Sequence, residues 1–146
     1  MEPQNSSDTY YMQEALSEAR KAYKKDEVPI GAVCVYQDKI ISRGHNLIER
    51  ANDVIHHAEI IAIKRASNKL KNWRLDDISL YTTVAPCIMC SGCILNSRIS
   101  RLVYGANNDN FSGIELLKGK LEIISGVLEE EALKLMQDFF KGRRSG

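Results

Sequence analysis

The order of helix and strand patterns along this 146-residue sequence restricts its fold more than any other feature. Two apolar segments, 31–36 and 40–45, are separated only by Gln37-Asp38-Lys39 and predict a β-hairpin. Helical and strand patterns then alternate, with helices predicted over 57–68 and from Pro86, and strands over 78–83, 99–105 and 121–124. Such alternation is typical of a sheet covered by helices on both faces, and the hairpin makes that sheet mixed. We therefore expect an α/β fold, a three-layer α/β/α sandwich around a mixed five-stranded sheet.

Helices are also predicted at both ends of the sequence. The first is capped by Ser7 or Asp8, and the last runs from about Leu128 to Lys141. The length is typical of one domain, so we expect a single domain over residues 1–146. No apolar stretch approaches the roughly 20 residues needed to cross a bilayer, and the N-terminus has no signal-peptide pattern. We expect no membrane partner and a cytoplasmic location.

Composition limits the function further. The chain is 44% apolar and 27% charged, which are globular proportions. Its 20 basic and 19 acidic side chains leave a formal net charge of +1, which excludes a protein that holds polyanions by bulk charge. In a cytoplasmic protein the four cysteines are not expected to form disulfides, so metal binding or redox catalysis must be considered.

Two short motifs contain the residues best suited to chemistry, His57-Ala58-Glu59 and Pro86-Cys87-Ile88-Met89-Cys90. A catalytic zinc ion takes three nitrogen, sulfur or oxygen ligands and keeps a fourth position for water. His57, Cys87 and Cys90 supply three such ligands, and both motifs fall where predicted helices begin. Free backbone amides and the helix dipole there favour thiolate and hydroxide. Two thiolates and a neutral imidazole cancel the charge of the ion, so its water needs a nearby proton acceptor, for which Glu59 is the candidate.

Other interpretations of the cysteines and histidines stay open at this point. Cys87-x-x-Cys90 alone is compatible with a redox pair, which the upstream His-x-Glu disfavours. A structural zinc site needs four protein ligands. Cys93 would be the fourth, but we expect Cys93 and Cys34 to pack in the core. We expect His45 to be structural and His56 to lie at the surface. An inactive, zinc-dependent RNA-binding module would not need Glu59.

His-x-Glu followed by Pro-Cys-x-x-Cys is the signature of zinc-dependent deaminases. The chain resembles the bacterial tRNA adenosine deaminase (TadA) family well beyond that signature, over roughly residues 10–144. The stretches that carry this resemblance include Val28-Pro29-Ile30-Gly31-Ala32, Gly44-His45-Asn46, Asn72-Trp73-Arg74-Leu75 and Leu80-Tyr81-Thr82-Thr83. The resemblance implies a cytidine deaminase-like fold, one Zn²⁺ per chain and a homodimer.

It also implies a reaction, the hydrolytic deamination of adenosine to inosine at the wobble position of a tRNA anticodon loop. In that reaction Zn²⁺ is held by His57, Cys87 and Cys90, and Glu59 is the catalytic residue. The substrate-binding residues implied are Asn46, Pro29, Ala58, Val84 and Pro86. The RNA contacts expected are Asn108, Phe140, Lys141, Arg143 and Arg144, since basic and aromatic side chains suit single-stranded RNA.

Several positions differ from the family pattern. Ala85 stands where the family usually has Glu, Val54-Ile55-His56 replace Pro-Thr-Ala, and Asn108 stands where Asp is usual. The segment after Gly105 is shorter than usual. Residues 82–87 and 107–111 also resemble fungal-type cytosine deaminases, which act on a free base. A deaminase of a free nucleobase or nucleoside, of cytosine or guanine type, is therefore the alternative function.

Overall fold

Five strands form one mixed sheet. The computed structural model describes residues 6–109 and 111–144, with Ser6, Arg143 and Arg144 described by their backbone alone. The strands are β1 (Gly31–Tyr36), β2 (Lys39–His45), β3 (Ser79–Val84), β4 (Arg101–Ala106) and β5 (Glu122–Ile124). Their order in the sheet is β2-β1-β3-β4-β5. The β1–β2 and β1–β3 pairs are antiparallel, and the β3–β4 and β4–β5 pairs are parallel. The predicted mixed five-stranded sheet is confirmed.

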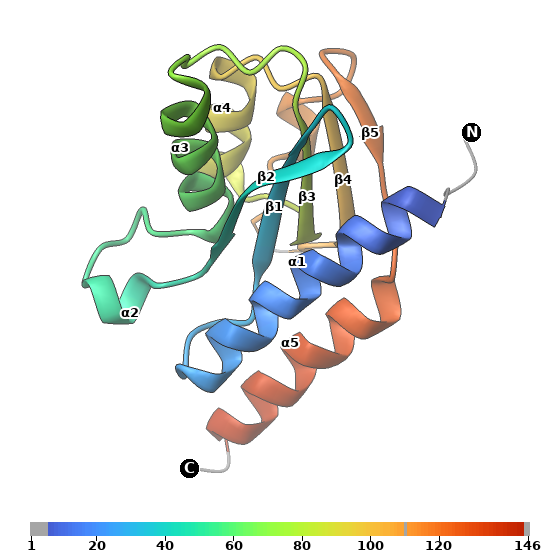
Figure 1. The fold of residues 1–146 in the computed structure, drawn as a ribbon. Coiled ribbons are helices and arrows are strands. Elements are labelled where there is room, and N and C mark those ends of the chain that lie inside the picture. The colour runs from blue at the N-terminus through green and yellow to red at the C-terminus, as the bar shows by residue number, and fades with distance from the viewer. Residues whose placement is uncertain (1–5, 110, 145–146) are drawn as a thin grey trace.

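Helices cover both faces of the sheet (Figure 1). One face is covered by α3 (Ala58–Leu70) and α4 (Ile88–Asn96), and the other by α1 (Ser6–Lys24) and α5 (Glu129–Arg144). The larger apolar core lies between the sheet and the α3/α4 layer, and a second core lies under α1. This is the predicted three-layer α/β/α sandwich. Within the described residues, no helix is both long and apolar enough to span a membrane.

The sequence explains how the hairpin and the close packing of α3 arise. Gln37 and Asp38 have φ angles of 51° and 62°, the left-handed pair that a two-residue hairpin turn with the correct twist requires. Gly44 on β2 lies against α3 so closely that a Cβ there would be 2.5 Å from the carbonyl oxygen of Ala58. The absence of a side chain at Gly44 therefore sets the depth at which the first turn of α3 sits on the sheet.

Two local predictions are wrong. The polar composition of residues 46–53 predicts a loop, but they contain the single-turn helix α2 (Ile48–Ala51). Helix α1 begins at Ser6, so Asp8 lies inside its first turn instead of capping it. The Asp8 carboxylate accepts hydrogen bonds from Arg101 at 2.9 and 2.8 Å and from the Tyr81 hydroxyl at 2.5 Å. A buried ion pair with β4 has replaced the expected local cap.

Candidate active site

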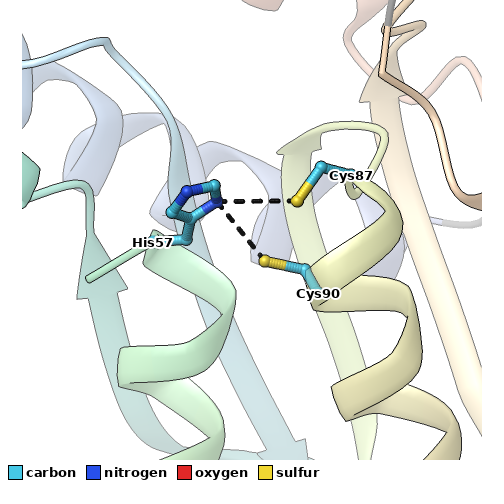
Figure 2. A group of neighbouring side chains, drawn as sticks. All are labelled: His57, Cys87 and Cys90. Atoms are coloured by element: carbon cyan, nitrogen blue, oxygen red, sulfur yellow. Dashed lines mark hydrogen bonds between the residues drawn. The ribbon is translucent and has the colours of Figure 1, made fainter. Parts of the chain in front are cut away.

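The two motifs meet at the N-termini of α3 and α4. His57 is the N-cap of α3 and Cys87 is the N-cap of α4, both in extended backbone conformation. The His57 Nδ1 atom lies 3.7 Å from Cys87 Sγ and 3.5 Å from Cys90 Sγ (Figure 2). All three ligand atoms lie within 4.8 Å of one another. The prediction that both motifs lie where helices begin is confirmed.

The spacing of these atoms fits a tetrahedral zinc ion. Zn–N bonds of about 2.05 Å and Zn–S bonds of about 2.3 Å at tetrahedral angles place the nitrogen and sulfur about 3.6 Å apart. The two observed N···S distances, 3.7 and 3.5 Å, bracket that value. One imidazole and two thiols are also the soft, three-ligand donor set typical of zinc. The group therefore satisfies zinc in both geometry and chemistry.

The cysteines already differ in acidity. The hydrogen bond with Cys90, aided by that with His57, lowers the pKa of Cys87 to about 4. The same hydrogen bond raises the pKa of Cys90, and the bond with Cys87 raises the pKa of His57. Cys87 is therefore a thiolate at neutral pH, which is the form that binds metal.

Glu59 lies in the first turn of α3 and is only 3% exposed. Burial raises the pKa of Glu59 to about 7. Its Oε1 atom is buried and has no hydrogen-bond partner among the described residues. A buried carboxylate oxygen without a partner is costly, and it is expected where a bound molecule completes the hydrogen bonding. Glu59 is therefore a buried carboxyl beside His57, Cys87 and Cys90, with a pKa at which it can both accept and release a proton near neutral pH.

Asn46 directly follows β2 and is hydrogen-bonded to the first residue of α3. Its Oδ1 atom accepts a hydrogen bond of 2.8 Å from the backbone N–H of Ala58, and its own N–H donates to Ile30 at 3.2 Å. Asn46 is 3% exposed. Because its oxygen is engaged by α3, the orientation of the amide is fixed and the NH₂ group is left to donate to a ligand.

A cavity of about 410 Å³ adjoins the group. It is lined by two members of that group, His57 and Cys87, and by Val54, Ile88, Met89, Asn108 and Phe111. Of these, Asn108 is a predicted RNA contact, whereas the sequence assigned no role to Val54, Ile88, Met89 or Phe111. Phe111 is 69% exposed, and its backbone N–H donates to Asn108 Oδ1 at 3.3 Å. The signal for Phe111 that the sequence offered was an aromatic residue within an otherwise polar segment.

A network of charges lies on the opposite side of β2. Glu18 of α1 is 2% exposed and contacts His45 Nδ1 at 3.0 Å and Lys21 Nζ at 2.7 Å. Lys25 Nζ lies 3.0 Å from the second ring nitrogen of His45. The prediction that His45 is structural is confirmed. Its contacts with α1 hold His45 in place, and His45 directly precedes Asn46.

Comparison with known proteins identifies the family. The family model of MafB19-like deaminases matches residues 6–144. A tRNA-specific adenosine deaminase of Streptococcus pyogenes serotype M1 is 43% identical, over 93% of this chain and 85% of the relative. The chain belongs to the tRNA-specific adenosine deaminase family. Another tRNA-specific adenosine deaminase, from Bacillus subtilis strain 168, is 41% identical over 95% of this chain and 92% of that protein.

A solved structure agrees with the family assignment. It comes from work on A-to-I editing by tRNA:A34 deaminases at the wobble position, and it matches the present fold with a TM-score of 0.83 at 39% identity. The match covers 87% of this chain and 99% of the other. The predicted cytidine deaminase-like fold is therefore confirmed.

The remaining predicted residues of this deaminase fall into two groups. Pro29, Ala58, Val84 and Pro86 are all buried, and Ala58 and Pro86 adjoin His57 and Cys87 in the sequence. On α5, Phe139 is 5% exposed and packs against Tyr23, whereas Phe140 is 43% exposed and Lys141 is exposed. The side chains of Arg143 and Arg144 lie outside the described part of the structure. Cys34 is buried and Cys93 packs against the larger core, as expected.

Proposed function

We propose that the protein converts adenosine to inosine at the wobble position of a tRNA anticodon loop. The observation that carries this proposal is the meeting of His57, Cys87 and Cys90 at zinc-compatible distances beside the buried, unpartnered carboxylate oxygen of Glu59. Membership of the tRNA-specific adenosine deaminase family supports the choice of base and of RNA. We also propose a cytoplasmic location.

We assign the metal-ligand role to His57, Cys87 and Cys90, with Zn²⁺ as the metal. When bound there, zinc lowers the pKa of a water molecule and makes it a nucleophile near neutral pH. The thiolate of Cys87 would attract the cation, and the helix N-termini at His57 and Cys87 stabilise the negatively charged ligands.

The protons in the reaction are moved by Glu59. It accepts a proton from the water that attacks C6 of adenine and delivers it to N1 of the ring. It then carries the second proton of the water to the departing amino group, which leaves as ammonia, and inosine remains. The side-chain NH₂ of Asn46 is free to hydrogen-bond the base, and Pro29, Ala58, Val84 and Pro86 surround it. The target must leave its base stack, which costs least for an unpaired loop nucleotide.

We further propose that RNA contacts come from Asn108 and from the end of α5, with Phe140, Lys141, Arg143 and Arg144. Exposed aromatic rings stack on unpaired bases, and basic side chains neutralise phosphates. We also propose a homodimer. The exposed fractions of Val54, Ile88 and Met89 are 71%, 62% and 37%, and an apolar surface of this kind beside a cavity supports burial against a second copy.

The test is turnover of an anticodon stem-loop RNA beside free adenosine, adenine, cytosine and guanine across a salt series. We expect inosine in the stem-loop, with activity falling steeply as salt rises, because RNA binding releases condensed counterions. Phe140→Ala should weaken stem-loop turnover, whereas Leu133→Ala, a similarly exposed apolar position on α5, serves as the matched control. Deamination of a free base without inosine in the stem-loop would establish the alternative function instead.

A further inference from the structure

Glu27 is a buried carboxylate outside the group of metal-ligand candidates. It lies between α1 and β1 and is 2% exposed. Its two oxygens accept backbone hydrogen bonds from different residues of α2, from Glu49 N–H at 3.1 Å and from Arg50 N–H at 2.8 Å. Glu27 therefore contacts the main chain of a segment 22 and 23 residues further along the sequence.

That segment, residues 46–57, connects two parts of the candidate active site. We call it the 46–57 loop. It begins with Asn46 and ends with His57, and Val54 within it lines the cavity. Its ends are joined by a hydrogen bond of 3.0 Å from Leu47 N–H to the carbonyl oxygen of His56. The base-binding candidate and the histidine ligand therefore both depend on how this loop is held.

The helix α2 within the loop has no side-chain cap from its own N-cap residue. Leu47 is the N-cap of α2 and makes no side-chain hydrogen bond to the helix. Two free amides of the first turn, those of Glu49 and Arg50, donate instead to the two oxygens of Glu27, which lies between α1 and β1. A carboxylate that accepts two backbone N–H bonds is a strong, charge-assisted anchor.

The charge of Glu27 has no ion-pair partner within the described part of the chain. Glu18, equally buried, differs because it contacts Lys21 and His45. Burying a carboxylate is costly unless hydrogen bonds compensate it. The hydrogen bonds from the α2 backbone compensate Glu27 for this cost. An apolar side chain could fill the same space without the desolvation cost, but it would leave α2 unanchored.

We propose that Glu27 is a positioning residue, which anchors the 46–57 loop and so keeps Asn46 and Val54 in the arrangement that receives the substrate base. This inference rests on the proposed function for its substrate. Its action is on binding: only molecules with the loop anchored are competent to bind, so KM rises in inverse proportion to the fraction of molecules that stay anchored, about tenfold when one tenth do. Once the base is bound the loop is in place, and kcat changes little.

The test compares Glu27→Gln and Glu27→Asp with Glu14→Gln. Gln keeps the size of the side chain but offers one acceptor to two amides, whereas Asp keeps the charge and is one methylene shorter. Glu14 is a half-exposed carboxylate on α1 that pairs with Arg43 and does not contact the loop. The measurements are kcat and KM on the stem-loop RNA, zinc per chain, the melting temperature, and hydrogen exchange at the amides of Glu49 and Arg50.

For Glu27→Gln we expect exchange at both amides to be about tenfold faster and KM about tenfold higher, with kcat within about threefold and zinc unchanged. Glu27→Asp should restore part of the KM, and Glu14→Gln should match the wild type. A merely structural role would lower the melting temperature and leave KM unchanged, and that result would overturn the inference, as would unchanged exchange in Glu27→Gln. If the wild type deaminates a free base instead, the proposed substrate is wrong, and the same comparison of KM is made with that base.

Discussion

Gly44→Ala provides a direct test of how the sheet positions α3. A Cβ at this position would lie 2.5 Å from the Ala58 carbonyl oxygen and 2.9 Å from the Ala62 nitrogen, and both are backbone atoms that cannot rotate away. Ordinary contact begins at 3.4 Å, so α3 must move by about 0.9 Å. His57 and Glu59 would move with it, relative to Cys87 and Cys90 on α4.

The expected loss is large because catalytic geometry is sensitive to such displacements. A misplacement of about 1 Å costs up to about 10²-fold in rate, and overpacking of this kind costs about 1–3 kcal/mol of stability. We expect Gly44→Ala to lower kcat/KM by about two orders of magnitude and to weaken zinc retention, measured on protein whose circular dichroism shows it to be folded.

The matched control is Gly92→Ala on α4, where a Cβ would meet nothing within 4 Å. It should keep full activity and gain up to about 1 kcal/mol, because Ala is the better helix former. Wild-type kcat/KM and zinc content in Gly44→Ala would refute the reasoning that this glycine sets the position of α3.

Three further predictions concern the metal, the proton carrier and the α1 layer. Glu59→Ala should keep one zinc per chain and lose about 10²–10⁴-fold in kcat, since it removes the group that moves protons; substantial turnover by the zinc-replete variant would contradict that role. Cys87→Ala and Cys90→Ala should each lose zinc by elemental analysis and melt at lower temperature, because binding of the metal is coupled to folding; full zinc retention in both would exclude them as ligands. Burial raises the pKa of Glu18, but hydrogen bonds from His45 and Lys21 outweigh it and lower the value from 4.5 to about 2. The stabilisation by Glu18 is therefore complete above pH 4.5 and is lost as the pH falls towards 2, so urea unfolding should show the advantage of wild type over Glu18→Gln shrinking across that range; a constant difference would count against it.

The ligand candidates could be predicted from the sequence because the signal is local. Each motif begins a helix, and two helices that follow strands of one sheet and cover the same face place their N-termini at the same edge. The core role of Cys34 and the structural role of His45 followed from their positions on apolar strands.

The contacts that were missed join residues far apart in the sequence. Asp8 was predicted as a helix cap because its true partner, Arg101, is 93 residues away and leaves no signal in the neighbouring sequence. Residues 46–53 looked like a loop because the carboxylate that caps α2 belongs to Glu27, on another element. Phe111 lies between polar residues and Val54 is followed by a single apolar residue, Ile55, so neither belongs to a periodic pattern that would place it in a cavity wall.

The division of the ligand candidates between α3 and α4 links metal binding to the integrity of the whole chain. His57 and Cys87 are 30 residues apart in the sequence. In the unfolded chain, closing a loop of that length costs roughly 3.5 kcal/mol, a cost that the folded protein no longer bears when it binds the ion. On this ground alone, the folded chain would bind the metal several hundred times more tightly than the unfolded chain. Unfolding and metal release would occur together, so the temperature at which the protein denatures should depend on the concentration of free zinc around it.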